Sequence, residues 1–202
     1  MSLGILGGTF NPPHLGHLLC AQEARHQLGL ERVLLIPTGT APHKTERENP
    51  GPEHRLALCH AAAAGDDGLD VSDLEMRREG PSFTVDTLEE LTRQDPNRRL
   101  YFILGGDAAA GLAGWHRPER VLELATLAVA RRRGTPPEKV RQALERVPGG
   151  DRTEFFKMPR IGISSTMIRG RVRSGAPIRY MVPEAVSAYI SEQGLYGGAA
   201  HT

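Results

Sequence analysis

The chain lacks several features that mark specialised classes of protein. Its 202 residues include two cysteines, Cys20 and Cys59, which form neither a C-x-x-C pair nor a disulfide framework. Both lie in apolar stretches with a helical pattern, so we expect buried thiols in a reducing compartment. No apolar run reaches the roughly 18 residues of a membrane-spanning helix, and the start MSLGILGG has no signal-peptide pattern. The sequence therefore predicts a cytoplasmic protein without a membrane segment.

Neither sign of charge predominates. Lys and Arg number 25 against 24 Asp and Glu, which leaves a formal charge of +1. This balance argues against a general nucleic-acid binder, although it allows a local basic pocket. With 39% hydrophobic residues the chain can bury a sizeable core. We expect a single domain over residues 1–202, with a C-terminal helical portion at about 163–196.

Short apolar stretches alternate with helical patterns along the chain. We predict strands at 3–6, 32–37, 69–76 (with a turn), 99–107, 126–132 and 153–158, and helices at 17–28, 53–64, 84–93, 117–125, 136–146, 165–173 and 183–193. The connections are too long for hairpins, so the fold class is α/β: a Rossmann-like, doubly wound, mainly parallel sheet with helices on both faces. Ligands bind beyond the carboxyl ends of such strands, which are followed here by residues 7–17, 37–47, 105–115 and 161–169.

The stretch "GGTFNPPHLGH" (residues 7–17) joins the first strand to the first helix. Gly7 and Gly8 allow backbone N–H groups to approach a phosphate, and the helix start adds its positive dipole end. The stretch is neither a G-x-G-x-x-G fingerprint nor a P-loop. His14 and His17 can project from one helix face, where they can donate to phosphate oxygens or carry positive charge. A capping or packing role remains open for each; a zinc pair has no third ligand at a matching spacing.

The stretch "ISSTMIR" (residues 163–169) has the pattern of a helix start. Ser164 or Ser165 can cap the helix, and Ser165 and Thr166 place hydroxyl and N–H donors at its N-terminus. Arg169 follows one turn later, where its guanidinium can fork two phosphate oxygens. An ordinary capped helix with an exposed charge remains the alternative.

Together, the two stretches resemble the GTF(D/N)PxHxGH and ISSTxxR signatures of the nucleotidyltransferase superfamily, whose members join a nucleoside triphosphate to a phosphate-bearing acceptor. Three further stretches are similar to those of nicotinate-nucleotide adenylyltransferases: "PTGTAPHK" (37–44), "PSFTVDTL" (81–88) and "GGDAAAGLAGWHRPERVLELA" (105–125). Asn11, Ala41 and Phe83 stand where that family usually has Asp, Pro and Tyr. The resemblance runs from residue 3 to about residue 196.

The resemblance implies transfer of the adenylyl group of ATP to nicotinate mononucleotide, giving deamido-NAD and pyrophosphate in NAD biosynthesis. The catalytic residues that it implies are His14, His17, Lys44 and Arg169. The ATP-binding residues that it implies are Gly7, Gly8, Thr9, Phe10, Gly105, Asp107, Arg132, Ile163, Ser165 and Thr166. The acceptor-binding residues that it implies are Thr84, Trp115 and His116. Among Arg131, Arg132 and Arg133, the one that contacts adenine stays open, with Arg132 the best match.

The implied reaction needs no general base, because the acceptor phosphate is already a nucleophile near neutral pH. Mg²⁺ is expected to arrive with ATP, since the sequence offers no obvious carboxylate cluster for a metal site of its own. Two alternatives remain: a relative that uses CTP or another acceptor (nicotinamide mononucleotide or pantetheine phosphate), and a non-catalytic nucleotide-binding module. The intact His14, His17, Lys44 and Arg169 favour an enzyme.

Overall fold

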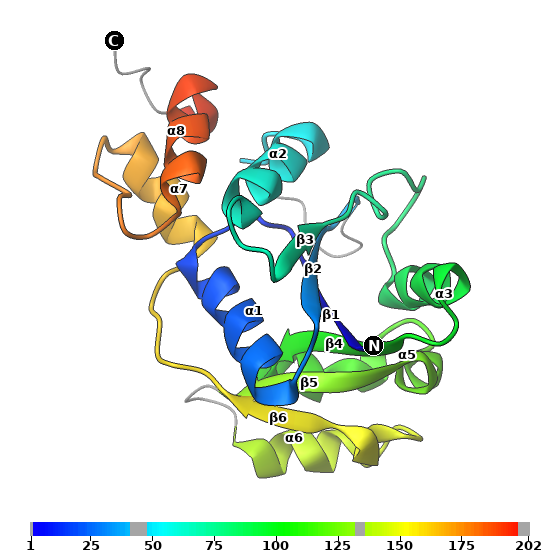
Figure 1. Cartoon of the computed structure of the whole chain (residues 1–202). Coiled ribbons are helices and arrows are strands. Elements are labelled where there is room, and N and C mark those ends of the chain that lie inside the picture. Colours follow the sequence, from blue (N-terminus) through cyan, green and yellow to red (C-terminus); the bar gives the residue numbers. More distant parts are fainter. Residues whose placement is uncertain (1, 41–47, 132–135, 198–202) are drawn as a thin grey trace.

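A parallel sheet of six strands organises the molecule (Figure 1). The computed structural model describes residues 2–40, 48–131 and 136–197. The strands are β1 (Ser2–Gly8), β2 (Arg32–Pro37), β3 (Leu69–Val71), β4 (Arg99–Gly105), β5 (Ala125–Arg131) and β6 (Glu154–Lys157). Their order is β3-β2-β1-β4-β5-β6, and each neighbouring pair is parallel. This arrangement confirms the predicted Rossmann-like α/β fold.

Helices cover both faces of the sheet, and each face has its own apolar core (Figure 1). The helices are α1 (Leu15–Leu28), α2 (Pro52–Ala63), α3 (Thr84–Gln94), α4 (Gly106–Ala110), α5 (Pro118–Leu124), α6 (Pro137–Leu144), α7 (Ser165–Arg173) and α8 (Glu184–Glu192), with short 3-10 turns at Leu112–Gly114, Gly150–Arg152 and Leu195–Gly197. Side chains of α1 and α2 belong to one core and those of α3 to α6 to the other. Helices α7 and α8 pack against α2 through a third apolar cluster.

The sequence accounts for the close packing of α1 on the sheet. The helix turns small side chains, Cys20, Ala21 and Ala24, toward the strands, and all three are buried. It ends at Gly29, whose φ of 62° lies in the left-handed region that glycine adopts without penalty. Within the described ranges, none of the helices has the length and apolar character to cross a membrane.

The bounds of several elements differ from the prediction by one or two residues, and the differences with a clear cause follow β3 and β4. The strand expected over 69–76 stops at Val71, because the next residues turn on Asp73, whose carbonyl accepts hydrogen bonds from Met76 and Arg77. The strand expected over 99–107 stops at Gly105, and the unpredicted helix α4 begins at once. The run of alanines at 108–110 favours this helix.

The strand order creates a topological switch point between β1 and β4. After β1 the chain continues to α1 on one face of the sheet. After β4 it continues to α4 on the opposite face, so the two connections diverge at the carboxyl edge of the sheet. Such a switch point is where open α/β sheets bind ligands. The strands that flank it end in Gly7 and Gly8 on one side and in Gly105 on the other.

Both cysteines should be unreactive in the folded protein. Cys20 is 5% exposed and Cys59 is fully buried, and burial raises the pKa of the Cys59 thiol to about 12 against a weaker opposing effect of Arg55. The thiolate is the reactive species. An aromatic disulfide reagent at about pH 8 should therefore label neither cysteine until guanidinium unfolds the chain. Labelling of either thiol in the native protein, at the rate of a free thiol, would contradict the structure.

Candidate active site

The opening turn rests on Phe10. Its side chain is 2% exposed, and its backbone φ of 49° carries the chain sharply away from β1. A Cβ atom at Gly8 would lie 3.4 Å from the Phe10 ring, an ordinary van der Waals distance, so the ring packs beside the end of β1. The Phe10 ring also meets the His17 ring edge to face, with centroids 5.0 Å apart. The Phe10 side chain thus packs in the core beneath the turn. Of this residue, the backbone is therefore the part that can make the contact with ATP that the resemblance implies.

The two histidines cap the start of α1. His14 is the N-cap residue, and its Nδ1 accepts a hydrogen bond from the N–H of Gly16 at 3.1 Å. The Nδ1 of His17 accepts in return from the N–H of His14 at 3.2 Å. The two rings stack with centroids 3.7 Å apart. The capping role that the sequence left open is therefore real for both residues.

The capping bonds decide which ring nitrogens can serve a ligand. A neutral imidazole that accepts at Nδ1 carries its proton on Nε2 and is a donor there. A doubly protonated ring would instead direct an N–H at a backbone N–H, and two stacked cations would repel each other. The geometry of His14 and His17 thus favours neutral rings that donate from Nε2 over the cationic alternative.

The stretch 163–169 docks directly onto the opening turn. Ser164 caps α7, while the Ser165 hydroxyl donates to the carbonyl of Pro12 at 2.8 Å. The Nη1 of Arg169 donates to the carbonyl of Asn11, also at 2.8 Å. Residues more than 150 positions apart are brought together in this way. Because the hydroxyl of Ser165 is engaged within the protein, its backbone N–H is the better candidate for a phosphate contact.

A carboxylate meets the guanidinium that was expected to bind phosphate. Arg169 is 9% exposed, and its Nε donates to one carboxylate oxygen of Glu48 at 3.0 Å. The other oxygen of Glu48 pairs with Arg173, and the Asn11 side chain donates to the Glu48 carbonyl at 3.1 Å. Glu48 therefore engages the Nε of Arg169, one of the donors that a bound phosphate would need.

Two pairs of aromatic rings involve residues of β4, the segment that follows it and the residue before α3. The Phe83 and His116 rings contact each other, with centroids 4.5 Å apart, and Trp115 meets Phe102 edge to face at 5.9 Å. Trp115 is half-buried, so one side of it packs on the core. Thr84 begins α3, whose N-cap residue Phe83 makes no side-chain capping bond. The first N–H groups of α3 therefore have no side-chain cap from Phe83, which itself contacts His116.

Some of the remaining predicted site residues lie within the described part of the chain, and two lie outside it. Asp107 is exposed in the first turn of α4. A Cβ at Gly105, the last residue of β4, would meet no atom within 4 Å. Ile163 is half-buried just before α7, and Thr166 is exposed in its first turn. Lys44 and Arg132 lie outside the described residues.

A family model and individual relatives place the chain in the same family. The family model described as "Cytidylyltransferase-like" matches residues 5–171. A protein of Desulfitobacterium hafniense (strain Y51), named "Probable nicotinate-nucleotide adenylyltransferase", is 44% identical over 200 residues, which cover 96% of this chain and 95% of the relative. A protein of the same name from Roseiflexus sp. (strain RS-1) is 46% identical, covering 96% and 97%.

The chain belongs to the nicotinate-nucleotide adenylyltransferases of the cytidylyltransferase-like family. Among solved structures, the Plasmodium falciparum nicotinic acid mononucleotide adenylyltransferase complexed with NaAD superposes with a TM-score of 0.80 over 99% of both chains. Its sequence identity is 17%, so this likeness concerns the fold.

Arg55 is a residue of this adenylyltransferase fold that the sequence analysis missed. The side chain is 1% exposed on α2 and donates to the carbonyls of Thr9 (3.1 Å), Thr38 (2.6 Å) and Gly39 (3.1 Å). It therefore ties the end of β1 to the loop after β2. A signal was present, because Arg55 lies on the same helical stripe as the buried residues Leu58, Cys59 and Ala62.

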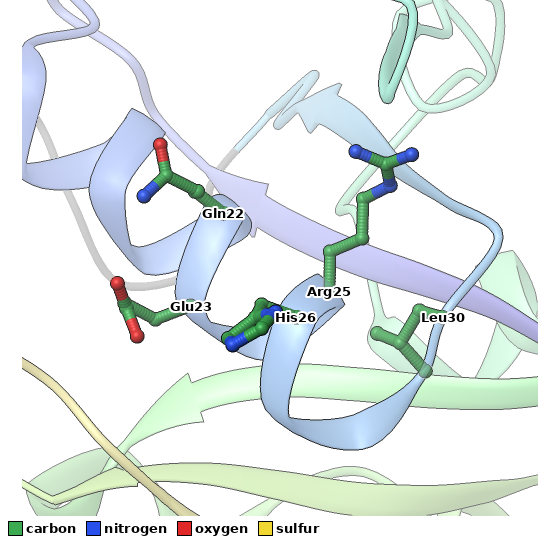
Figure 2. Close-up of a pocket in the computed structure, with 5 residues that line it drawn as sticks. All are labelled: Gln22, Glu23, Arg25, His26 and Leu30. Atoms are coloured by element: carbon green, nitrogen blue, oxygen red, sulfur yellow. The ribbon is translucent and has the colours of Figure 1, made fainter.

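A surface hollow of the adenylyltransferase, shown in Figure 2, is lined by none of the candidate site residues. It is lined by Gln22, Glu23, Arg25, His26 and Leu30. Arg25 uses its Nε to hold the α1–β2 turn at the Glu31 carbonyl, 3.0 Å away. These residues lie in the second half of α1 and just after it, whereas His14 and His17 lie at its start. We therefore exclude this hollow from the candidate site.

Glu48→Gln should strengthen the binding of inorganic pyrophosphate. The change neutralises the carboxylate that now pairs with Arg169 and Arg173. A partly exposed ion pair is worth about 0.4–1 kcal/mol, so the Kd should fall about two- to fivefold at low ionic strength. Titration calorimetry measures the effect. Glu53→Gln, at an exposed acidic residue in the first turn of α2, should leave the Kd unchanged. An unchanged or higher Kd for Glu48→Gln would show that Glu48 does not compete for the anion.

Proposed function

We propose that this chain transfers the adenylyl group of ATP to nicotinate mononucleotide, releasing deamido-NAD and pyrophosphate, and that residues 1–202 work as one domain. The observation that carries the proposal is the docking of Ser165 and Arg169 on the carbonyls of Pro12 and Asn11. This contact joins both phosphate-binding motifs beside the end of β1. The names of the relatives at 44% and 46% identity support nicotinate mononucleotide as the acceptor.

ATP lies along the opening turn in this proposal. Its triphosphate meets the backbone of Gly7 to Phe10 and the start of α1, whose dipole favours an anion. The Nε2 groups of His14 and His17 donate to the β- and γ-phosphates. Backbone N–H groups of Ser165 and Thr166 add donors from α7. Asp107 accepts from a ribose hydroxyl, and adenine lies near Ile163 and Arg132.

The acceptor lies beside the aromatic residues that follow β4 and precede α3 in this proposal. Trp115 already packs one side on the core, and it presents the other to the pyridine ring. The uncapped N–H groups at the start of α3, beginning with Thr84, attract the pyridine carboxylate. His116 is held against Phe83 and borders the same space. A carboxylate acceptor suits this helix start better than the neutral amide of nicotinamide mononucleotide.

Catalysis consists of positioning and charge stabilisation. A phosphate oxygen of nicotinate mononucleotide attacks the α-phosphorus of ATP in line, and the bond from that phosphorus to the pyrophosphate oxygen breaks. The leaving pyrophosphate gains negative charge, which the histidine Nε2 donors and Arg169 stabilise. Arg169 must first exchange Glu48 for the triphosphate, because Glu48 holds its Nε. Lys44 is proposed to act from the loop after β2.

Mg²⁺ enters this proposal as part of the ATP substrate. In the part of the chain that the structure describes, no three His, Cys, Asp or Glu side chains gather as ligands for a metal ion. The protein residues near the triphosphate are instead donors, which suit phosphate oxygens. We therefore assign the ion to the triphosphate and its bound water rather than to these side chains.

Pyrophosphate release tests the reaction and the acceptor together. Purified protein is assayed with MgATP and, in turn, nicotinate mononucleotide, nicotinamide mononucleotide and pantetheine phosphate, and then with MgCTP. We expect the highest kcat/KM with ATP and nicotinate mononucleotide. A preference for another acceptor or for CTP would replace the proposed substrates, and no release with any pair would favour a binding module.

His17→Ala should lower kcat about 10²–10³-fold, because a donor to the leaving pyrophosphate is lost. The substitution also removes the acceptor for the N–H of His14, which costs about 0.5–2 kcal/mol of folding free energy. Thermal unfolding therefore has to accompany the kinetics, and His17→Asn serves as a variant that can still accept that bond. His26→Ala, at an exposed histidine on the same helix, is the matched control (Figure 2). A normal kcat for His17→Ala would reject the assigned role.

A further inference from the structure

Glu75 is a buried carboxyl group for which the proposed mechanism has no use. It follows β3 and is 8% exposed. The Thr87 hydroxyl, on α3, donates to its Oε1 at 2.8 Å, and Arg78 donates to that hydroxyl at 3.3 Å. Burial raises the pKa of Glu75, and the Thr87 hydrogen bond and the Arg78 charge oppose this rise.

The segment around Glu75 is pressed against the loop that follows β2. A Cβ atom at Gly39 would lie only 2.3 Å from the Glu75 carbonyl oxygen, so the two backbones are in close contact. Further along, the Ser82 N–H donates to the Thr40 carbonyl at 2.9 Å. Gly39 in turn accepts from Arg55, which also binds the Thr9 carbonyl. Glu75 is thus fixed relative to the ends of β1 and β2.

The hydrogen bond between Thr87 and Glu75 anchors the first turn of α3 to the segment that follows β3. Thr87 lies one turn after Phe83, and its N–H donates to the Phe83 carbonyl at 3.4 Å. Phe83 contacts His116, and Thr84 is the first residue of the helix. The Glu75–Thr87 hydrogen bond therefore connects the sheet edge to the residues that were assigned to the acceptor.

We propose that Glu75 is a positioning residue for the acceptor: its hydrogen bond from Thr87 sets the start of α3, and thereby Phe83 and Thr84, at the distance from Trp115 and His116 that a pyridine nucleotide needs. Glu75 itself touches neither substrate. The inference rests on the proposed function, because it takes nicotinate mononucleotide as the acceptor. A group needed for packing alone would not require a buried carboxyl, whose desolvation is costly.

Paired variants separate the hydrogen bond from the bulk of the side chains. Thr87→Val and Glu75→Leu remove the bond, whereas Thr87→Ser and Glu75→Gln keep a donor and an acceptor. Thr92→Val is the matched control, because the Thr92 hydroxyl donates only within α3, to the Leu88 carbonyl at 2.8 Å. Trp115 is the sole tryptophan, so its fluorescence reports binding of nicotinate mononucleotide without turnover.

Thr87→Val and Glu75→Leu should each raise the Kd and the KM for nicotinate mononucleotide about tenfold, as for loss of a well-placed hydrogen bond to a charged group. The KM for ATP should stay within about twofold, and Thr87→Ser, Glu75→Gln and Thr92→Val should remain near the wild type. Thermal unfolding of each variant shows how much fold stability has changed.

Three results would overturn the inference: equal changes in the KM for ATP and for the acceptor, a fall in the unfolding temperature without a change in the acceptor Kd, or equal effects of Thr87→Val and Thr92→Val. Failure of the proposed function has a different signature. The wild-type protein would then neither bind nor adenylylate nicotinate mononucleotide, and the inference would fall with it. A wild type that turns this acceptor over beside unaffected variants would remove the inference alone.

Discussion

The docking of α7 on the opening turn is the contact on which the site depends. Arg169 and Ser165 satisfy two carbonyls, those of Asn11 and Pro12, in a turn that belongs to neither β1 nor α1. Buried backbone carbonyls need such partners, since an unpaired one costs about 1–3 kcal/mol. The backbone N–H of Leu15 adds a third link, to the carbonyl of Met181 between α7 and α8. The C-terminal helices thereby stabilise the turn on which the triphosphate is proposed to lie.

At the start of α1, structural and chemical roles use different atoms of the same side chains. A helix start leaves backbone N–H groups without partners, and His14 and His17 satisfy two N–H groups there through Nδ1. Serine or aspartate would cap the helix as well, but neither would present a second nitrogen that donates. Capping and phosphate binding are therefore complementary explanations of the motif, because the cap sets the tautomer that makes Nε2 a donor.

Periodicity and local motifs predicted those features that depend on short stretches of sequence. The apolar runs identified β2 with its full bounds and the parallel character of the sheet, and Ser-Ser-Thr identified the start of α7. Glu48 and Arg55 escaped prediction because groups from other parts of the chain hold them: Glu48 meets Arg169 121 residues later, and Arg55 meets the Thr9 carbonyl 46 residues earlier. Glu75 lies in the stretch predicted as a strand over 69–76, and only the turn after Val71 brings its carboxylate to Thr87 on α3. A charged residue is expected at the surface until the fold shows which group buries it. For Phe10, the motif was recognised, but its side chain proved to be core.

ATP and the acceptor are assigned to opposite sides of the switch point between β1 and β4. This division explains why the sequence motifs identify the ATP site better than the acceptor site. The ATP side consists of backbone, histidine caps and α7, all dictated by the geometry of one turn and one docking contact. The acceptor side consists of the start of α3 and the segment after β4, joined by the Phe83–His116 contact. Its position is set by side chains such as Glu75 and Thr87, which can change without disturbing the triphosphate turn. A fold of this kind can keep its transfer chemistry while it exchanges acceptors, because reaction and specificity depend on different contacts.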